Sequence, residues 1–143
     1  MEWIDESVAI GGWRDVARVR LLQKEKIDLI MDARPLFTGP RSARRPLVDR
    51  VNRSADLLVD LSKRGVKVMV RCHHGRDRSP FVVMLYICRR SGLGYKEAYE
   101  LVKSKRPRTI FHPEWVEAFS APENDQAGHP LPKVTTDEPV SPV

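Results

Sequence analysis

The chain has few cysteines and no long apolar segment. Its 143 residues include two cysteines, Cys72 and Cys88, sixteen positions apart and without a Cys-x-x-Cys pair. That pattern indicates neither a disulfide framework nor a zinc ribbon, and it is typical of a reducing compartment. The longest apolar run covers residues 81–88, whereas a membrane-spanning helix needs about 20 apolar residues. Because residues 1–20 also carry too many charges for a secretory signal, we expect a soluble, cytoplasmic protein.

Aromatic residues are scarce, at 7% of the chain, and none lies in the arginine run at residues 41–45. Platforms for single-stranded nucleic acid interleave aromatic and basic side chains. Their absence argues against a nucleic-acid binder of this kind. The sequence contains no internal repeat, and its length fits one ordinary domain with its own core.

Positive charge is abundant in the body of the chain but not at its end. The formal net charge is +6; residues 121–143 hold four carboxylates against Lys133, a net −3, which leaves +9 on residues 1–120. The same terminal stretch contains five of the eleven prolines and no aromatic residue, which predicts a disordered tail. We therefore place a single compact domain at residues 1–120 and expect it to favour anionic partners.

The apolar pattern alternates between short strands and helices. The predicted strands cover 7–10, 27–31 and 66–71, and the predicted helices cover 14–25, 54–64, 80–90, 95–105 and 113–119. Ser54 is the expected cap of the second helix, and Gly65 is expected to end it. A loop rich in proline and arginine spans 33–50. This alternation predicts an α/β fold with a mainly parallel central sheet flanked by helices.

The stretch VMVRCHHGRDRSP, residues 68–80, lies where the third predicted strand meets a helix. Backbone N–H groups and the positive end of the helix dipole converge there, which makes an anion site and favours a thiolate. Cys72 is therefore a candidate nucleophile. Five residues separate it from Arg78 and Ser79, a C-x5-R-S spacing that lets loop amides surround an oxyanion while the guanidinium closes the ring. Gly75 supplies the freedom that such a turn needs.

These residues resemble the phosphate-binding loop of the cysteine-dependent protein tyrosine and dual-specificity phosphatases. The resemblance covers about residues 7–119, from the SVAIGG stretch to the helix pair after the loop. It implies two-step hydrolysis of phosphomonoesters, above all phosphotyrosine and also phosphoserine or phosphothreonine, without metal or cofactor. Cys72 would attack phosphorus and form a phosphocysteine, Arg78 would hold the phosphoryl oxygens, and Ser79 would help the thiolate to leave.

The other loop residues would surround the bound phosphate. They are His73, His74, Gly75, Arg76 and Asp77. The basic loop also resembles relatives that act on phosphoinositides or on RNA 5′-triphosphate ends, so these substrates stay open as alternatives. A phosphate-binding module without turnover is the alternative from another class. The expected partner is a phosphorylated protein, and we expect a monomer.

The resemblance further implies an aspartic acid on an upstream loop that protonates the leaving oxygen, a contribution typically worth ~10²–10⁴ in rate. The candidates are Asp32, Asp49, Asp56 and Asp60. Asp49 stands just before the helix that is predicted to begin at Ser54, in the segment where the family carries its acid. Asp49 is therefore the preferred candidate, and Asp32 is the next.

Several residues near the loop have competing interpretations. Cys72, His73 and His74 could suggest a metal ion, but three consecutive residues on a tight loop rarely face one ion, so no metal is expected. Cys88 lies on an apolar helix and is expected to be a core residue. Arg71 stands where the family usually has a histidine, and its effect on the thiolate is open.

The basic and aromatic residues outside the loop carry weaker signals. The arginines at 41, 44 and 45 form either a solvated loop or a substrate-facing basic wall beside Asp49. His112, beyond the predicted helix at 95–105, is most simply a surface residue.

Overall fold

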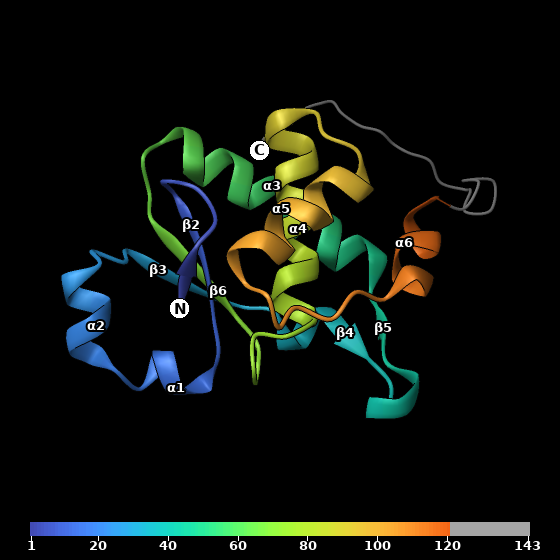
Figure 1. Cartoon of the computed structure of the whole chain (residues 1–143), viewed down its shortest axis with the longest axis horizontal. Coiled ribbons are helices and arrows are strands. Elements are labelled where there is room, and N and C mark those ends of the chain that lie inside the picture. The colour runs from blue at the N-terminus through green and yellow to red at the C-terminus, as the bar shows by residue number, and fades with distance from the viewer. Residues whose placement is uncertain (121–143) are drawn as a thin grey trace. The chain divides into compact units, whose positions relative to one another are not determined.

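The central sheet has four strands in the order β1-β2-β6-β3 (Figure 1). β1 is Glu2–Trp3, β2 is Val8–Gly11, β6 is Val68–Arg71 and β3 is Leu29–Asp32. β6 pairs in parallel with β2 and with β3, and β1 pairs antiparallel to β2. Since Val70 lies opposite both Ile10 and Met31, the three parallel strands end together at one edge of the sheet.

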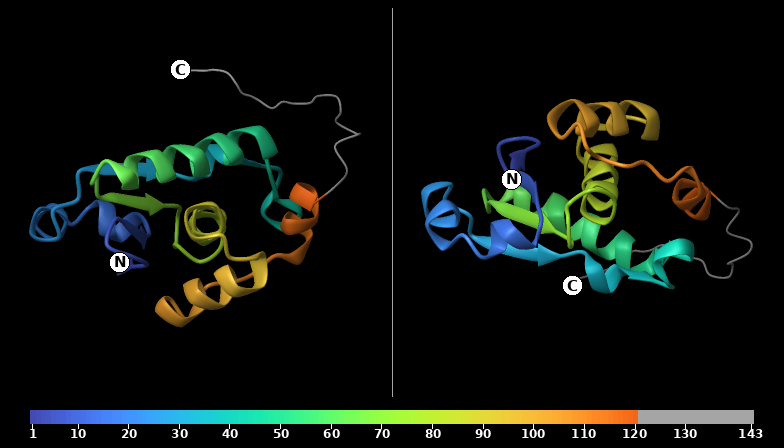
Figure 2. Two further views of the ribbon diagram at one scale, coloured as in Figure 1. Left: turned by 90° about the horizontal axis from the view of Figure 1, so that it is seen from above. Right: turned by 60° about the horizontal axis from the view of Figure 1, so that its bottom comes forward.

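Both inner strands are apolar and buried. Val8 to Ile10 of β2 and Val68 to Val70 of β6 have no exposed surface, as expected for parallel strands that are covered on both faces. α4, Arg78–Ser91, follows β6 and packs between α3, Val48–Lys63, and α5, Tyr95–Lys105. Figure 2 shows α4 end-on, with α3 on one side and α5 on the other. The predicted α/β fold with a mainly parallel, helix-flanked sheet is confirmed.

The connections between these elements contain shorter pieces. α1, Trp13–Val16, and α2, Val19–Lys24, follow β2. The predicted loop at 33–50 is more ordered than expected, because its chain folds back on itself as a small hairpin. That segment holds the 3-10 helices η1, Arg34–Leu36, and η2, Arg41–Ala43, and the paired strands β4, Phe37–Thr38, and β5, Arg45–Pro46.

Two predicted helices differ from the observed ones. The helix expected at 14–25 is divided at Arg18, whose φ of −96° and ψ of 77° are not helical. Neither α1 nor α2 buries a residue fully, so tertiary packing does not hold a continuous helix together. α3 begins at Val48 rather than at Ser54, because the residues that face the core start at Val51.

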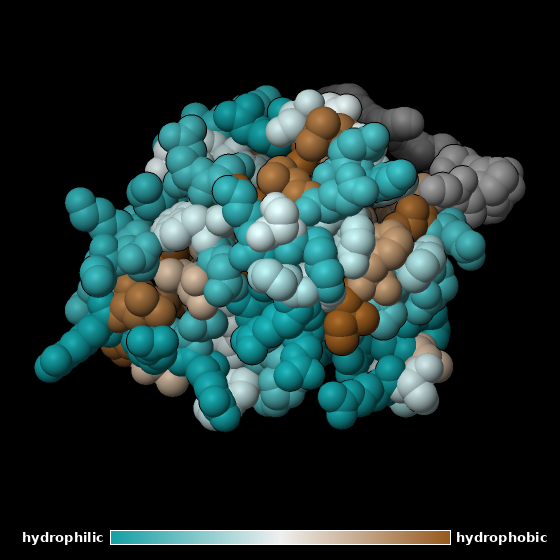
Figure 3. All heavy atoms as spheres, viewed as in Figure 1, coloured by the Kyte–Doolittle hydropathy of each residue, from teal (hydrophilic) through white to brown (hydrophobic). Residues whose placement is uncertain are grey.

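This computed structural model describes residues 1–120 of the chain. Met1–His112 form one compact unit; a second unit begins at Pro113 and carries α6, Pro113–Ser120. Across the described residues, no helix is both long enough and apolar enough to cross a bilayer. The face seen in Figure 3 is mainly hydrophilic, with apolar residues in separate patches. The tail predicted at 121–143 lies outside the described residues.

Candidate active site

Residues 72–77 connect the end of β6 to the start of α4. Cys72 is 1% exposed, and its Sγ lies 3.2 Å from the hydroxyl Oγ of the fully buried Ser79. Asp77 is the N-cap of α4, because its side chain accepts a hydrogen bond from the backbone N–H of Arg78 at 2.8 Å. The structure thus brings the thiol, the hydroxyl and the helix N-terminus together at one point, in an arrangement that suits an anion.

The loop turns at Gly75, which has a left-handed φ of +66°. A Cβ at Gly75 would lie 2.6 Å from Nη2 of Arg106 and 2.7 Å from the carbonyl oxygen of Gly11. A Cβ at Gly12 would lie 2.9 Å from the carbonyl oxygen of His73, which also accepts a hydrogen bond from the backbone N–H of Trp13 at 2.8 Å. The loop therefore rests directly on the backbone that follows β2, and larger residues at either glycine would push the two apart.

Arg106 holds the loop from the other side. Its guanidinium is 2% exposed, donates to the carbonyl oxygens of Gly75 at 2.6 Å and of His74 at 3.1 Å, and pairs with Glu2. Burial, with a smaller effect of Arg108, lowers the pKa of Arg106 to about 10. Sequence reasoning missed this residue, since an arginine just before a helix-ending proline is not a specific signal.

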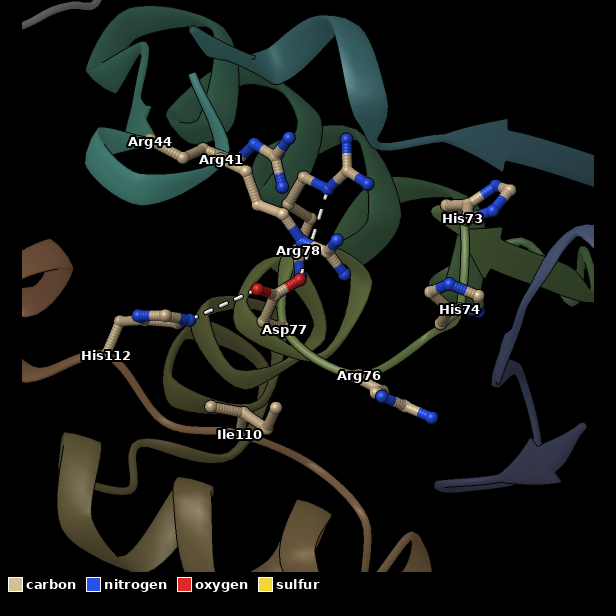
Figure 4. Close-up of a pocket in the computed structure, with 9 residues that line it drawn as sticks. All are labelled: Arg41, Arg44, His73, His74, Arg76, Asp77, Arg78, Ile110 and His112. Carbon is tan, nitrogen blue, oxygen red and sulfur yellow. Dashed lines mark hydrogen bonds and ion pairs between the residues drawn. The ribbon is translucent and has the colours of Figure 1, made fainter. Parts of the chain in front are cut away.

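A pocket of about 540 Å³ opens over the loop (Figure 4). Its wall comes from the loop, from the η2 segment and from the chain after α5. The lining residues are Arg41, Arg44, His73, His74, Arg76, Asp77, Arg78, Ile110 and His112. Four of these nine are arginines and one is a carboxylate, so the pocket suits an anionic ligand.

Arg78 is a largely buried cation of this wall, with a side chain that is 13% exposed. Its Nε lies 4.0 Å from Oδ1 of Asp77 but has no hydrogen-bond partner within residues 1–120. Desolvation lowers the pKa of Arg78, while the nearby Cys72 acts in the opposite direction. Because a buried donor without a hydrogen bond is costly, an oxyanion that accepts hydrogen bonds from Arg78 would be stabilised here.

The electrostatic surroundings of the loop are positive elsewhere too. Desolvation, followed by the charges of His73 and Arg76, lowers the pKa of His74. Arg34 has a raised pKa, mainly because it donates to Asp32, and Cys72 adds to the increase.

Arg71, the residue before Cys72, is buried and pairs with the neighbouring strand. It is 7% exposed, and its Nη1 lies 3.4 Å from Oδ2 of Asp32 on the neighbouring strand. Asp32 also accepts a hydrogen bond from Nη2 of Arg34 at 2.7 Å, and this contact is the main reason why the pKa of Asp32 is lowered. Asp32 thus holds two arginines at the edge of the sheet where the loop begins.

Asp49, the preferred acid of the sequence analysis, is exposed in the first turn of α3 and is not among the residues that line the pocket. Asp56 pairs with Arg89, and Asp60 pairs with Arg64. The carboxylate that lines the pocket is Asp77, whose Oδ2 lies 3.1 Å from Nε2 of His112.

The structure also brings residues to the pocket that the sequence analysis treated as peripheral. Arg41 and Arg44 line it, whereas Arg45 and Asp49 do not, and His112 lines it instead of serving only as a surface residue. No local signal could have found His112, because it lies 35 positions from its partner Asp77. Cys88 is half-buried, and burial raises the pKa of its thiol. Within residues 1–120, no three His, Cys, Asp or Glu side chains are placed to hold a metal ion.

Known proteins resemble this chain over most of its described length. The family model described as dual specificity phosphatase, catalytic domain, matches residues 17–120. Protein-tyrosine-phosphatase IBR5 of Arabidopsis thaliana is 27% identical over 122 residues, which cover 80% of this chain and 47% of that protein. Dual specificity protein phosphatase 1B of the same plant is 31% identical over 65 residues, covering 46% of this chain and 39% of the relative. The chain spans less than half the length of these relatives.

Solved structures share the fold at lower identity. Human DUSP28 superposes with a TM-score of 0.71 at 19% identity, covering 84% of this chain and 93% of that one. DUSP15 has a TM-score of 0.70 at 19% identity, with 80% and 81% coverage. PTPMT1, which is also known in complex with PI(5)P, has a TM-score of 0.65 at 19% identity, with 81% and 88% coverage.

Proposed function

The chain belongs to the family of dual specificity phosphatase catalytic domains, and from this premise we propose that it hydrolyses phosphomonoesters through a phosphocysteine on Cys72. The observation that carries the proposal is the buried thiol of Cys72, 3.2 Å from Ser79 Oγ, at the start of a loop that lines an arginine-rich pocket. The preferred substrate is phosphotyrosine in a protein, with phosphoserine and phosphothreonine as further substrates.

In the first step, Sγ of Cys72 attacks phosphorus while the bond from phosphorus to the leaving oxygen breaks. Arg78 and the loop amides hold the three equatorial oxygens as charge shifts in the transition state. In the second step, water attacks the phosphocysteine and the S–P bond breaks. Ser79 then donates a hydrogen bond to the departing thiolate, which its distance from Sγ supports. A proton donor for the leaving oxygen completes the cycle, and Asp49 is the donor that the family resemblance favours.

The same site supports a second class of substrate. The pocket is lined by four arginines and one carboxylate, and the structurally similar PTPMT1 is known in complex with PI(5)P. Substrates with several phosphates, namely phosphoinositides or RNA 5′-triphosphate ends, are therefore the second candidate. We further propose that the protein is a monomer, that it acts in the cytoplasm and that it needs no cofactor.

A substrate panel tests the proposal. Purified protein, with chelator and reductant present, should release phosphate from p-nitrophenyl phosphate. Cys72→Ser should lose this activity by a factor on the order of 10⁴ or more, as expected when a nucleophile is removed. Phosphopeptide, phosphoinositide and triphosphate-ended RNA then rank the substrate classes. If Cys72→Ser matched the parent, or if the protein only bound phosphate in a strongly salt-dependent manner, a binding module would replace the enzyme.

A further inference from the structure

The proton donor for the leaving oxygen can be sought from the geometry of the pocket. In-line displacement places the leaving oxygen opposite the attacking Sγ. Cys72 is 1% exposed, so the leaving group departs on the side of the pocket that opens to solvent. A proton donor must therefore sit in the accessible wall, within hydrogen-bond reach of that side.

Asp77 and His112 meet this requirement together. Their side chains are 25% and 27% exposed, both line the pocket, and Oδ2 of Asp77 lies 3.1 Å from Nε2 of His112. Oδ1 of Asp77 is fixed by the backbone N–H of Arg78, so the carboxyl cannot swing out of the wall without uncapping α4. Figure 4 shows the side chains of His112 and Asp77 pointing toward each other, with Arg78 beside Asp77.

We propose that the Asp77–His112 pair is the proton donor of the reaction; this inference rests on the proposed phosphatase function. In its acid form the pair carries one proton more than a carboxylate and a neutral imidazole together, and the contact between Oδ2 and Nε2 lets the two groups share it. As the P–O bond breaks, its electrons stay on the leaving oxygen, which takes that proton and departs as an alcohol or phenol. In the second step the pair regains a proton from the water that attacks phosphorus, and Cys72 leaves as thiolate.

The charges around the pair are nearly all positive. The other titratable and charged groups of the pocket are Arg41, Arg44, His73, His74, Arg76 and Arg78. Asp77 is the one carboxylate among the residues that line the pocket. Removing this carboxylate therefore removes both an acidic group of the wall and a hydrogen-bond partner of Nε2 of His112.

The decisive experiment compares leaving groups. Asp77→Asn keeps an oxygen for the cap of α4, and kcat/KM is measured with 2,4-dinitrophenyl phosphate, a good leaving group, and with phenyl phosphate, a poor one. The kcat/KM of the variant should fall by a factor of ~10²–10⁴ with phenyl phosphate and by much less with 2,4-dinitrophenyl phosphate, because only the poor leaving group needs the proton. The alkaline limb of the pH–rate profile should also disappear. His112→Gln should shift that limb and cause a smaller loss.

Controls separate this inference from the proposed function. Asp60 is a surface carboxylate paired with Arg64, so the Asp60→Asn variant should behave as the parent. Inhibition of the Asp77→Asn variant by inorganic phosphate shows whether its loop still binds the anion. The proposal is overturned if Cys72-dependent turnover persists and Asp77→Asn keeps the leaving-group dependence of the parent, or if Asp49→Asn instead shows the selective loss on phenyl phosphate. If Cys72→Ser turns over like the parent, the proposed function itself has failed.

A second inference comes from a separate hollow beside the first pocket. This neighbouring pocket, of about 370 Å³, shares His73, His74 and Arg76 with the first. Its wall adds Arg14, Arg18 and Arg108. Its carboxylates are engaged, since Glu2 pairs with Arg106 and Asp15 accepts a hydrogen bond from the backbone N–H of Gly12 at 2.9 Å.

Apart from Arg106, the arginines of this second wall have no such partner within the described residues. Within residues 1–120, Arg14, Arg18, Arg76 and Arg108 form no ion pair with a carboxylate. We infer that the neighbouring pocket binds a second phosphate of the substrate. Because the two pockets share three residues of one short loop, the fitting ligand is a compact molecule that carries two phosphates a short distance apart.

Turnover of an inositol bisphosphate and of the matching monophosphate tests this inference. The bisphosphate should have a kcat/KM about tenfold higher, which corresponds to about 1.4 kcal/mol. Arg14→Ala combined with Arg108→Ala should abolish that advantage, and it should lower turnover of the bisphosphate far more than turnover of p-nitrophenyl phosphate. Arg20→Ala, an exposed arginine of α2 outside both pockets, is the matched control. An unchanged ratio in the double variant overturns the inference. If a second phosphate raises kcat/KM only in a doubly phosphorylated peptide and not in the inositol bisphosphate, the inference that the ligand is compact is overturned.

Discussion

The buried frame of the site and its basic rim differ in how their polar groups are satisfied. The frame consists of Cys72, Gly75, Ser79, Gly12 and Arg106, which are all buried and bonded or packed to one another. The rim consists of the exposed Arg41, Arg76 and Arg108, whose side chains form no ion pair within the described residues. In the proposed reaction the frame would hold the transition state rigidly, whereas the rim would bind further anionic groups of the substrate.

Gly75→Ala is expected to break the frame most severely. A left-handed φ costs a non-glycine residue about 1–2 kcal/mol, and the new Cβ would also overlap Arg106 and the Gly11 carbonyl. A loop displaced by about 1 Å costs about 10²-fold in rate, so kcat/KM on p-nitrophenyl phosphate should fall by at least that factor. Gly65→Ala is the matched control, because Gly65 has a φ of +79° but nothing within 4 Å. Gly65→Ala should lower the free energy of unfolding without lowering kcat/KM. Equal kcat/KM of the two variants would show that the contacts of Gly75 with Arg106 and Gly11 do not position the loop.

Arg106→Met should weaken the frame by removing the hydrogen bonds that Arg106 donates to the loop. The change leaves the carbonyl oxygens of Gly75 and His74 without their donor, a cost of about 1–3 kcal/mol in the free energy of unfolding. Because the loop then loses its position, kcat should fall about 10-fold or more while phosphate binding falls less. Thermal unfolding and kcat are measured together, with the exposed Arg53→Met of α3 as the control. Partial recovery of kcat in Arg106→Lys is also expected, and a stable Arg106→Met with full kcat would contradict the positioning role.

Arg41→Ala should affect the rim without disturbing the frame. Steering by exposed charges is screened by salt. The variant should therefore raise KM for a phosphopeptide about three- to tenfold at low ionic strength, with little change in kcat. The difference between parent and variant should shrink as salt is added. A kcat effect that persists at high salt would place Arg41 in the frame instead.

Asp32→Asn should have the smallest effect. Asp32 is 35% exposed, so its pairs with Arg71 and Arg34 are partly screened, and we expect a loss of about 1 kcal/mol in the free energy of unfolding. The pKa of Asp32 is lowered in the folded state, mainly by Arg34. Its contribution is therefore fully present above the ordinary aspartate pKa of about 3.9 and is lost as the pH falls through the lowered value. Denaturation of parent and variant at neutral and acid pH should converge at acid pH, and a constant difference would exclude the ion pairs as its cause.

Parts of the site could be predicted because they are local in the sequence. Cys72, Arg78 and Ser79 lie within eight positions on one strand–loop–helix connection, so their spacing alone brings them together. The glycine turn and the apolar strand before it are equally local. The start of α3 was predicted six residues too late, since Ser54 looked like a cap while the apolar face that orders the helix begins earlier.

The sequence by itself determined the reactive loop, the parallel sheet that presents it and the positive charge around it. Only the tertiary structure decided which distant residues complete the site. Arg106 and His112 reach the loop from after α5, and Gly12 meets it from the end of β2. It also placed Asp77 rather than Asp49 in the pocket wall. The physical reason is that these contacts depend on how the loop, the end of β2 and the chain after α5 pack together, which no spacing along the chain records.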